Sequence, residues 1–349
     1  METKRNNGID LLRLVLMFMI CVLHVLGQGG VLNSCIVGSI EYKVYWFLEI
    51  FCLCAVDTFA LISGYTATDK PRKYEKLINM WFQVFFYSFI ITAIFAVAGV
   101  FVFDKKELIK NIFPITFKAF WYMTAYFALF LAMPMFNAFL FKLEEKSAKK
   151  WLVVIVGIYG IMGSIIDTFH TNWGYSALWL MVLYCIGALA KRVKLFEKKK
   201  TSTLIVIWII SVVLNWILYI CSGKRMLIEY ICPTMLLNAV IMVILFSRMK
   251  LNGKIISKLY PYALGVYLFQ LNTVIWNVYL IARASFIVNE GLATGIVVVF
   301  TYASILFIAG LVVECIRSKV AKLIHIPELS KKIVVLLDKI LNYVIRILK

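Results

Sequence analysis

The sequence predicts an all-α polytopic membrane protein with about ten transmembrane helices, both termini in the cytoplasm and an amphipathic interfacial helix at the C-terminus. Its 349 residues are 63% hydrophobic, with a mean hydropathy of +0.90. Only 16% are charged, against roughly 25% in an average soluble domain. Long apolar segments recur along the chain, and lysine and arginine gather between them. This composition excludes a soluble enzyme, a disordered chain and a nucleic-acid-binding module.

Ten segments have the length and apolar character of membrane spans, which need about 20 residues of helix. They are residues 9–27, 44–66, 77–103, 119–141, 151–167, 174–190, 203–222, 227–248, 259–281 and 292–316. A transmembrane β-strand needs only about ten alternating residues, so these lengths favour helices. The third segment is the longest, and we expect it to tilt or to extend beyond the membrane.

The distribution of positive charge sets the expected orientation, because lysine and arginine concentrate in cytoplasmic loops. With a cytoplasmic N-terminus, 29 of the 37 lysines and arginines fall on the inner side and eight on the outer side. The outer loop 104–118 runs against this trend, since it holds four lysines. The net charge of +19 therefore indicates topology and contact with anionic lipid, and no nucleic-acid partner is expected. Abundant lysine, isoleucine and phenylalanine suggest a bacterial plasma membrane protein.

We divide the chain into a ten-helix membrane domain, residues 1–325, and a tail, residues 326–349. In the tail, apolar residues recur at helical spacing between scattered cations: Ile333, Leu336, Leu337, Ile340, Leu341, Val344, Ile345 and Leu348. This pattern is typical of an amphipathic helix lying on the inner leaflet. The eight cysteines and three histidines form no metal-binding pattern, so no metal is expected.

Charged and polar residues inside the first span are functional candidates, because ionisable groups there are energetically costly. Arg13 and His24 are eleven residues apart. At about 100° per residue this separation is about 20° beyond three full turns, so both side chains share one face, about 16 Å apart along the axis. A shared polar pathway is one interpretation. The alternatives are an anchoring arginine, paired with Asp10 at i,i+3, and a histidine that only packs.

The second span carries Asp57 near mid-membrane and Ser63-Gly64-Tyr65 near its inner end. We expect Asp57 to pair with His24 or Arg13 on the neighbouring helix, because an unpaired buried carboxylate is unfavourable. Gly64 allows either close helix contact or a local break.

A compact basic turn follows the second span, with Lys70, Arg72 and Lys73 around Pro71. Positive-inside charge explains this turn most simply. The functional alternative is a clamp for phosphate groups.

On the outer side, Trp121 and Tyr122 begin the fourth span, and Asp167, His170 and Trp173 lie in a short polar loop. Interfacial aromatic residues are one explanation. The alternative is a surface that faces a sugar acceptor, where aromatic rings and polar groups meet a glycan.

Several of these stretches resemble the acyltransferase-3 family, integral membrane enzymes that O-acylate cell-surface carbohydrates. The resemblance rests on Arg13 and His24 at their spacing, Asp57-Thr-Phe-Ala-Leu-Ile-Ser63-Gly64-Tyr65, the basic turn, Phe120-Trp121-Tyr122-Met-Thr-Ala-Tyr126 and Leu264-Gly265-Val266-Tyr267-Leu268. It implies an essential histidine at His24 with its arginine at Arg13. The chain departs from the family at Gln270, where related sequences often carry histidine. A second catalytic histidine is therefore not implied there.

The resemblance implies an acyl-CoA donor in the cytosol, usually acetyl-CoA, and an acceptor hydroxyl on an extracytoplasmic cell-surface glycan. We expect His24 to act as general base or to carry the acyl group, with Asp57 orienting the ring. We expect Arg13, Ser63, Tyr65, Lys70, Arg72 and Lys73 to bind the donor. Some relatives carry an extracellular hydrolase-like domain, so a separate extracellular partner is conceivable.

Two other classes of protein fit the same polar spans. One is a transporter or flippase of a lipid-linked sugar, and the other is a ligand sensor built on the same membrane domain. Only an enzyme would release free CoA from acetyl-CoA, which separates the three.

Overall fold

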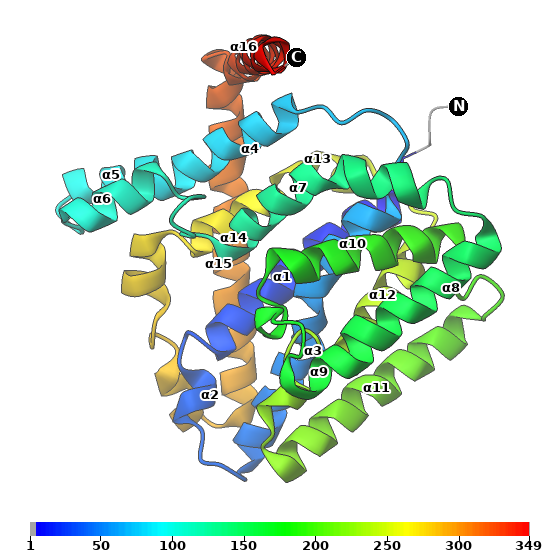
Figure 1. Cartoon of the computed structure of the whole chain (residues 1–349). Helices are drawn as coiled ribbons and strands as arrows, with labels where there is room; N and C mark the ends of the chain where they lie inside the picture. The colour runs from blue at the N-terminus through cyan, green and yellow to red at the C-terminus, as the bar shows by residue number, and fades with distance from the viewer. Residues whose placement is uncertain (1–4, 349) are drawn as a thin grey trace.

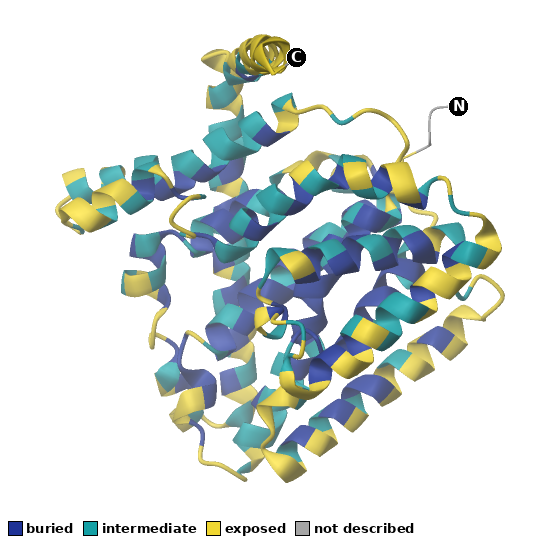
Figure 2. Cartoon of the chain, in the orientation of Figure 1, coloured by how far each residue is buried: buried dark blue, intermediate teal, exposed yellow. Residues whose placement is uncertain are grey.

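The computed structural model describes residues 5–348, and within that part every regular element is a helix. Residues 1–4 and Lys349, which carry part of the predicted inner charge and the end of the predicted tail, lie outside the described residues. Figure 1 shows the helices gathered around α1 (Asn7–Leu26) and α3 (Ile40–Tyr65). Figure 2 shows that burial is greatest in these central helices.

Seven helical stretches within residues 5–348 are long and apolar enough to cross a membrane. They are α1 with α2 (Asn7–Ser34), α3 (Ile40–Tyr65), α4 with α5 (Glu75–Val97), α7 (Trp121–Leu140), α8 with α9 (Glu145–Ile166), α11 (Thr201–Ser222) and α15 (Leu292–Leu323). A bent pair, Lys254–Gln270 and Ile275–Glu290, would make an eighth. The chain is therefore a polytopic α-helical membrane protein.

Two further predicted spans are helical but short. They are α10 (Ala177–Arg192) and α12 (Pro233–Ser247). At 1.5 Å per residue, each covers less than a full bilayer of about 30 Å. Every predicted span thus overlaps at least one helix, while length and hydropathy support seven or eight crossings.

The predicted continuous span 259–281 is wrong, because the structure bends by 77° between Gln270 and Ile275. Asn272 explains the break. Its side-chain oxygen accepts hydrogen bonds from the backbone N–H groups of Val274 and Ile275, which caps the start of the following helical segment. Its amide donates to Tyr87 O and Thr92 Oγ1, which anchors the break to the third span.

The predicted span 77–103 also ends early. Helix α5 (Ile91–Val97) stops at Val97, and Gly99 follows with φ +74, a left-handed conformation that glycine adopts readily. The segment that follows contains α6 (Lys105–Ile112). Asp104 caps this helix, and its side chain accepts a hydrogen bond from Glu107 N.

Helices α3 and α10 cross at two glycines, Gly64 on α3 and Gly187 on α10. A Cβ atom at Gly64 would lie 1.9 Å from the carbonyl oxygen of Tyr184, and one at Gly187 would lie 2.2 Å from that of Leu61. Only glycine permits this approach, since real Cβ contacts are never so short. Of the two alternatives for Gly64, the structure shows close helix contact, and α3 continues to Tyr65 without a break.

We expect Gly64→Ala to destabilise the protein by about 1–3 kcal/mol, because the added methyl group must push α3 and α10 apart. Gly157→Ala is the matched control, since a Cβ at Gly157 meets nothing within 4 Å. Thermal unfolding of both variants in detergent measures the difference. Equal melting temperatures for the two variants would contradict the close-contact explanation.

The tail forms helix α16 (Ile326–Ile347), which follows α15 after His325 in a left-handed conformation with φ 56. Near its start α16 packs on α4 (Glu75–Phe85), where Ser330 Oγ donates to Asn79 Oδ1 at 2.9 Å. Beyond Ser330 the helix is largely exposed, including apolar residues such as Leu336 and Leu341. Figure 1 shows it crossing the end of α15.

Candidate functional site

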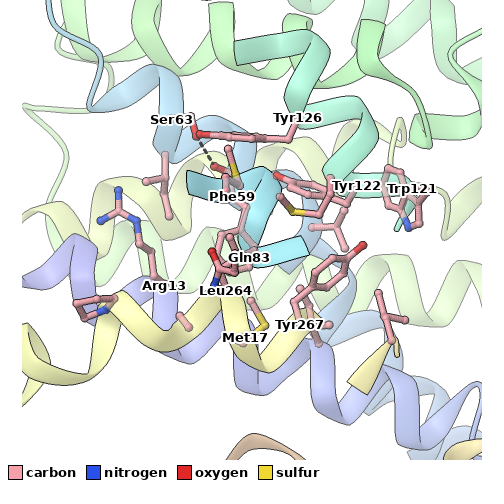
Figure 3. Close-up of a pocket in the computed structure, with 18 of the residues that line it drawn as sticks. Arg13, Met17, Phe59, Ser63, Gln83, Trp121, Tyr122, Tyr126, Leu264 and Tyr267 are labelled. Carbon is pink, nitrogen blue, oxygen red and sulfur yellow. Dashed lines mark hydrogen bonds between the residues drawn. The ribbon is translucent and has the colours of Figure 1, made fainter. Parts of the chain in front are cut away.

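One large cavity, of about 1040 Å³, lies at the centre of the helices. Its wall comes from α1, α3, α4, α7, α14 (Ala263–Gln270) and the C-terminal part of α15. Figure 3 shows Arg13 at one side of this cavity and Trp121 and Tyr122 toward the other, with Ser63 and Tyr126 between them. Its volume falls at the upper end of the range typical of small-molecule sites.

Arg13 and His24 both line this cavity, as their placement on one face of α1 predicts. Helix α1 begins at Asn6, whose side chain accepts hydrogen bonds from Gly8 N and Ile9 N. Arg13 then lies in the first half of the helix and His24 in its last turn. The two side chains therefore stand about 16 Å apart along the wall of one cavity.

Arg13 is held by Asp10, the i,i+3 partner expected from the sequence. Its Nη1 lies 2.7 Å from Asp10 Oδ1, and Arg5 Nε lies 2.5 Å from the other carboxylate oxygen. Both guanidinium groups also approach the ring of Tyr260, at 4.1 Å for Arg5 and 5.9 Å for Arg13. Two cations thus share one carboxylate, which leaves positive charge at this end of the cavity.

Two lysines and a third arginine join Arg13 at this end. Lys76 comes from the first turn of α4, and Arg317 and Lys322 come from the end of α15. Arg317 is paired with the buried Glu314, at 2.6 Å and 2.8 Å. Neither lysine has an ion-pair partner among residues 5–348. We call these four residues, Arg13, Lys76, Arg317 and Lys322, the cationic cluster.

His24 is half-buried, and its Nδ1 atom has no hydrogen-bond partner among the described residues. The indole of Trp276 meets the imidazole edge-on, with ring centroids 5.1 Å apart. The buried amide of Gln270, which also lacks partners, lies near the ring. The Nδ1 atom of the imidazole is therefore available to a ligand or to a proton in the cavity.

Aromatic side chains line the cavity beyond His24. Trp121 lies 4.8 Å from Tyr175 between ring centroids, and Tyr175 lies 4.7 Å from Tyr230. Tyr122 contacts Tyr267 edge-on at 6.2 Å. Together with Trp276, these rings form the aromatic end of the cavity, which also contains the carboxylate of Glu49.

The expected pairing of Asp57 with His24 or Arg13 is wrong. Asp57 is fully buried away from the cavity wall, and its Oδ1 accepts a hydrogen bond of 2.9 Å from Trp179 Nε1 on α10. Its position in α3 turns the side chain toward α10, the helix that packs on the Gly64 face. In this structure Asp57 therefore joins α3 to α10 and does not orient His24.

We expect Trp179→Phe to lower the free energy of unfolding by about 1–3 kcal/mol, because the buried carboxyl group of Asp57 loses its donor. Trp208→Phe is the control, since the buried Nε1 of Trp208 donates to no described residue. Denaturant unfolding followed by circular dichroism compares the two. A Trp208 variant that loses as much stability as the Trp179 variant would count against the hydrogen bond.

Ser63 and Tyr65, two residues apart on α3, face different sides. Ser63 lines the central cavity, and its Oγ donates to Phe59 O (Figure 3). Tyr65 lines a separate, smaller cavity of about 140 Å³, where its hydroxyl lies 3.2 Å from Ser247 Oγ. Lys191 Nζ lies 4.9 Å from its ring. The structure does not bring Tyr65 to the central cavity.

The basic turn also lies outside the central cavity. Arg72 donates from Nη2 to the hydroxyl of Tyr184 at 3.0 Å and approaches the ring of Phe130 at 5.8 Å. Lys70 and Lys73 are exposed, and neither lines the cavity. The sequence analysis expected Arg72 and Lys73 to bind the donor. The cavity wall contains other cations instead, namely Lys76, Arg317 and Lys322.

The structure places the five predicted acceptor residues in two different regions. Trp121 and Tyr122 line the cavity, whereas Asp167, His170 and Trp173 do not. Asp167 organises its own loop by accepting from Thr171 N, Thr171 Oγ1 and Trp173 N. Burial alone would raise the pKa of Asp167, but these hydrogen bonds outweigh it and lower the pKa below its usual value. His170 is exposed.

The charged cavity residues that the sequence predictions did not assign are Glu49, Lys76, Arg317 and Lys322. Glu49 carries the strongest sequence signal, a carboxylate within an apolar span. The other three lie among inner-loop cations, where positive-inside charge hides any individual role. Within the described residues, no group of three or more histidine, cysteine or acidic side chains is arranged to hold a metal ion.

The fold and the site define a multi-pass α-helical membrane protein with a central cavity that is cationic at one end and aromatic at the other. The sequence model of the acyltransferase-3 family, described as an acyltransferase domain, matches residues 6–314. The chain therefore belongs to the acyltransferase-3 family and is a membrane acyltransferase. No curated protein and no solved structure matched the chain.

Proposed function

We propose that this protein transfers an acyl group, specifically acetyl, from cytosolic acetyl-CoA to a hydroxyl group of an extracytoplasmic cell-surface glycan. The observation that carries the proposal is the single cavity lined by both the cationic cluster and His24. A donor with phosphate groups at one end and a thioester at the other fits a cavity that has cations at one end and His24 toward the other.

The cationic cluster supports a phosphorylated donor. Lys76 and Lys322 lack carboxylate partners among the described residues, so their charge is available to phosphate oxygens. Arg13 and Arg317 are each oriented by a neighbouring carboxylate, which fixes the guanidinium geometry. The proposed assignment of the donor phosphates is therefore to Arg13, Lys76, Arg317 and Lys322.

The charge distribution supports a cytoplasmic position for this end. The start of α1, the start of α4 and the end of α15 all adjoin segments that the positive-inside rule assigns to the inner side. Under this orientation the cluster opens toward cytosolic CoA. His24 and the aromatic end then lie in the outer half of a bacterial plasma membrane.

His24 is the proposed catalytic residue. A neutral imidazole takes the proton of the acceptor hydroxyl while its oxygen attacks the thioester carbonyl carbon. The carbon–sulfur bond breaks, and the departing thiolate takes the proton back from the imidazolium. In the alternative route, the imidazole nitrogen attacks the thioester carbonyl carbon, the carbon–sulfur bond breaks, and the thiolate leaves with the ring N–H proton as free CoA. The hydroxyl oxygen then attacks the acyl carbon, the carbon–nitrogen bond breaks, and the hydroxyl proton returns to the imidazole. Both routes use the unpaired ring of His24.

The aromatic end supports a glycan acceptor. Four aromatic side chains line this end: Trp121, Tyr122, Tyr175 and Tyr230. Their rings have apolar faces and polar edges, which suit a sugar ring that is apolar on one face and carries hydroxyl groups at its rim. Trp121 and Tyr122 were expected on this side from the sequence. The proposed chemistry needs no separate extracellular protein, because one cavity contains both the cationic and the aromatic end.

Release of free CoA by the purified protein tests the proposal. We expect acetyl-CoA to yield CoA when extracted envelope glycan is present, with the acetyl label appearing on the glycan. A transporter or a sensor would leave acetyl-CoA intact under the same conditions. Intact acetyl-CoA with every glycan fraction of the producing cell would therefore refute the enzymatic function.

A further inference from the structure

Glu49 is a carboxyl group in the wall of the cavity that has no partner among residues 5–348. It projects from α3 into the end that contains His24. Its Oε2 atom is buried and accepts no hydrogen bond, and no cation within the described residues forms an ion pair with it. Buried carboxylates are normally paired or hydrogen-bonded, so this one has capacity for a ligand.

The carboxylate lies about one helical turn beyond His24. Gly27 follows His24 by three residues on α1, a rise of about 4.5 Å. A Cβ atom built on Gly27 would lie 3.8 Å from Glu49 Oε1. Because Gly27 has no side chain, nothing from α1 fills the space in front of the carboxylate at this turn. Along the axis of α1, His24 and Glu49 are therefore about one helical turn apart.

Aromatic rings flank the same space. Trp121 and Tyr230 are stacked at 6.4 Å with an interplanar angle of 18°, and Tyr175 lies between 4.7 and 4.8 Å from each of them. Glu49 lines the same cavity as these three rings. The carboxyl group of Glu49 and these aromatic rings therefore line the same end of the cavity.

A carboxyl group holds two oxygen atoms side by side, and these can form hydrogen bonds with two neighbouring hydroxyl groups. We propose that Glu49 is the specificity-determining residue for the acceptor: it binds two adjacent hydroxyl groups of one sugar ring and thereby presents a further hydroxyl of that ring to His24. This inference rests on the proposed function, and it names the group that recognises the acceptor. It predicts selection for sugars with a vicinal diol.

Equilibrium binding of monosaccharides to the full chain in lipid nanodiscs tests the inference directly. The probes are the methyl glycosides of glucose, galactose, mannose and rhamnose, measured by saturation-transfer NMR. We expect at least one probe to bind, and Glu49→Gln to weaken its binding about tenfold or more. Glu49→Asp should recover part of the affinity. A deoxy analogue that lacks one of the two adjacent hydroxyls should bind the wild type as weakly as the parent sugar binds Glu49→Gln.

Glu229→Gln is the matched control, because Glu229 is a half-buried carboxylate near the same end that does not line the cavity. It should bind the sugar within about twofold of the wild type. Failure of all four probes to bind, or equal binding by wild type and Glu49→Gln, would overturn the inference.

Acetyl-CoA assays on the same samples separate this inference from the proposed function. Glu49-dependent sugar binding without release of CoA would support Glu49 and refute the acyltransfer reaction. Release of CoA with an acceptor KM unchanged in Glu49→Gln would support the reaction and refute the role of Glu49. Binding of CoA alone should be the same in wild type and Glu49→Gln, since Glu49 lies away from the cationic cluster.

Discussion

Replacement of His24 by alanine is expected to reduce acyl transfer by at least 100-fold while the protein remains folded. General base catalysis contributes typically 10²–10⁴-fold, and an acyl-carrying residue contributes more. No other histidine lines the cavity, so no neighbouring imidazole can substitute. Acetyl incorporation into envelope glycan, normalised to the amount of protein in the membrane, measures the effect.

The chain supplies its own controls for this variant. His170 and His325 are both exposed and lie outside the cavity wall, so His170→Ala and His325→Ala should retain activity within about twofold. His24→Ala should still bind CoA, because the cationic cluster is intact. Full activity in His24→Ala would remove the imidazole from the reaction, and loss of activity in His170→Ala would move the chemistry to the outer loop.

Replacement of both Lys76 and Lys322 by alanine is expected to weaken acetyl-CoA binding about 10- to 100-fold. Hydrogen bonds to charged groups contribute about 1.5–3 kcal/mol each, and 1.4 kcal/mol corresponds to a factor of ten. Both lysines are exposed, so solvent screening brings the expected loss below the sum of two such bonds. Calorimetric titration with CoA and with dephospho-CoA measures the effect and identifies the phosphate involved.

The double variant Lys70→Ala, Lys73→Ala is the matched control. It removes the same net charge from the same side of the molecule, but from residues that do not line the cavity. Its CoA affinity should stay within about twofold of the wild type. If instead this variant loses affinity and the Lys76, Lys322 variant does not, the basic turn is the phosphate clamp and the cavity end is not.

The positions of the helices were predictable because apolar length and charge act locally along the sequence. Each predicted span overlaps at least one helix, since a lipid-facing backbone must satisfy its hydrogen bonds within the segment. The break at Asn272 was not predictable, because it depends on Tyr87 and Thr92, which are 185 and 180 residues away. The short length of helices such as α10 was not predictable either, because hydropathy does not show how a helix packs against its neighbours.

The candidate site divides in the same way. Arg13 and His24 were predictable as one unit because both lie on one helix, where 3.6 residues per turn fixes their common face. Asp57 was assigned to the wrong partner, because the choice between α1 and α10 is decided by the close contact at Gly64 and Gly187. The cationic cluster joins α1, α4 and α15, and no sequence pattern brings these three helix ends together.

The most direct test of the cavity as the route between the two compartments uses sealed inside-out membrane vesicles from cells that produce the protein. These vesicles expose the cytoplasmic face and enclose the cell's own outer glycan. Labelled acetyl-CoA added outside should acetylate the enclosed glycan, and His24→Ala vesicles should show no labelled glycan. Label that appears only after the vesicles are opened would contradict transfer through the cavity.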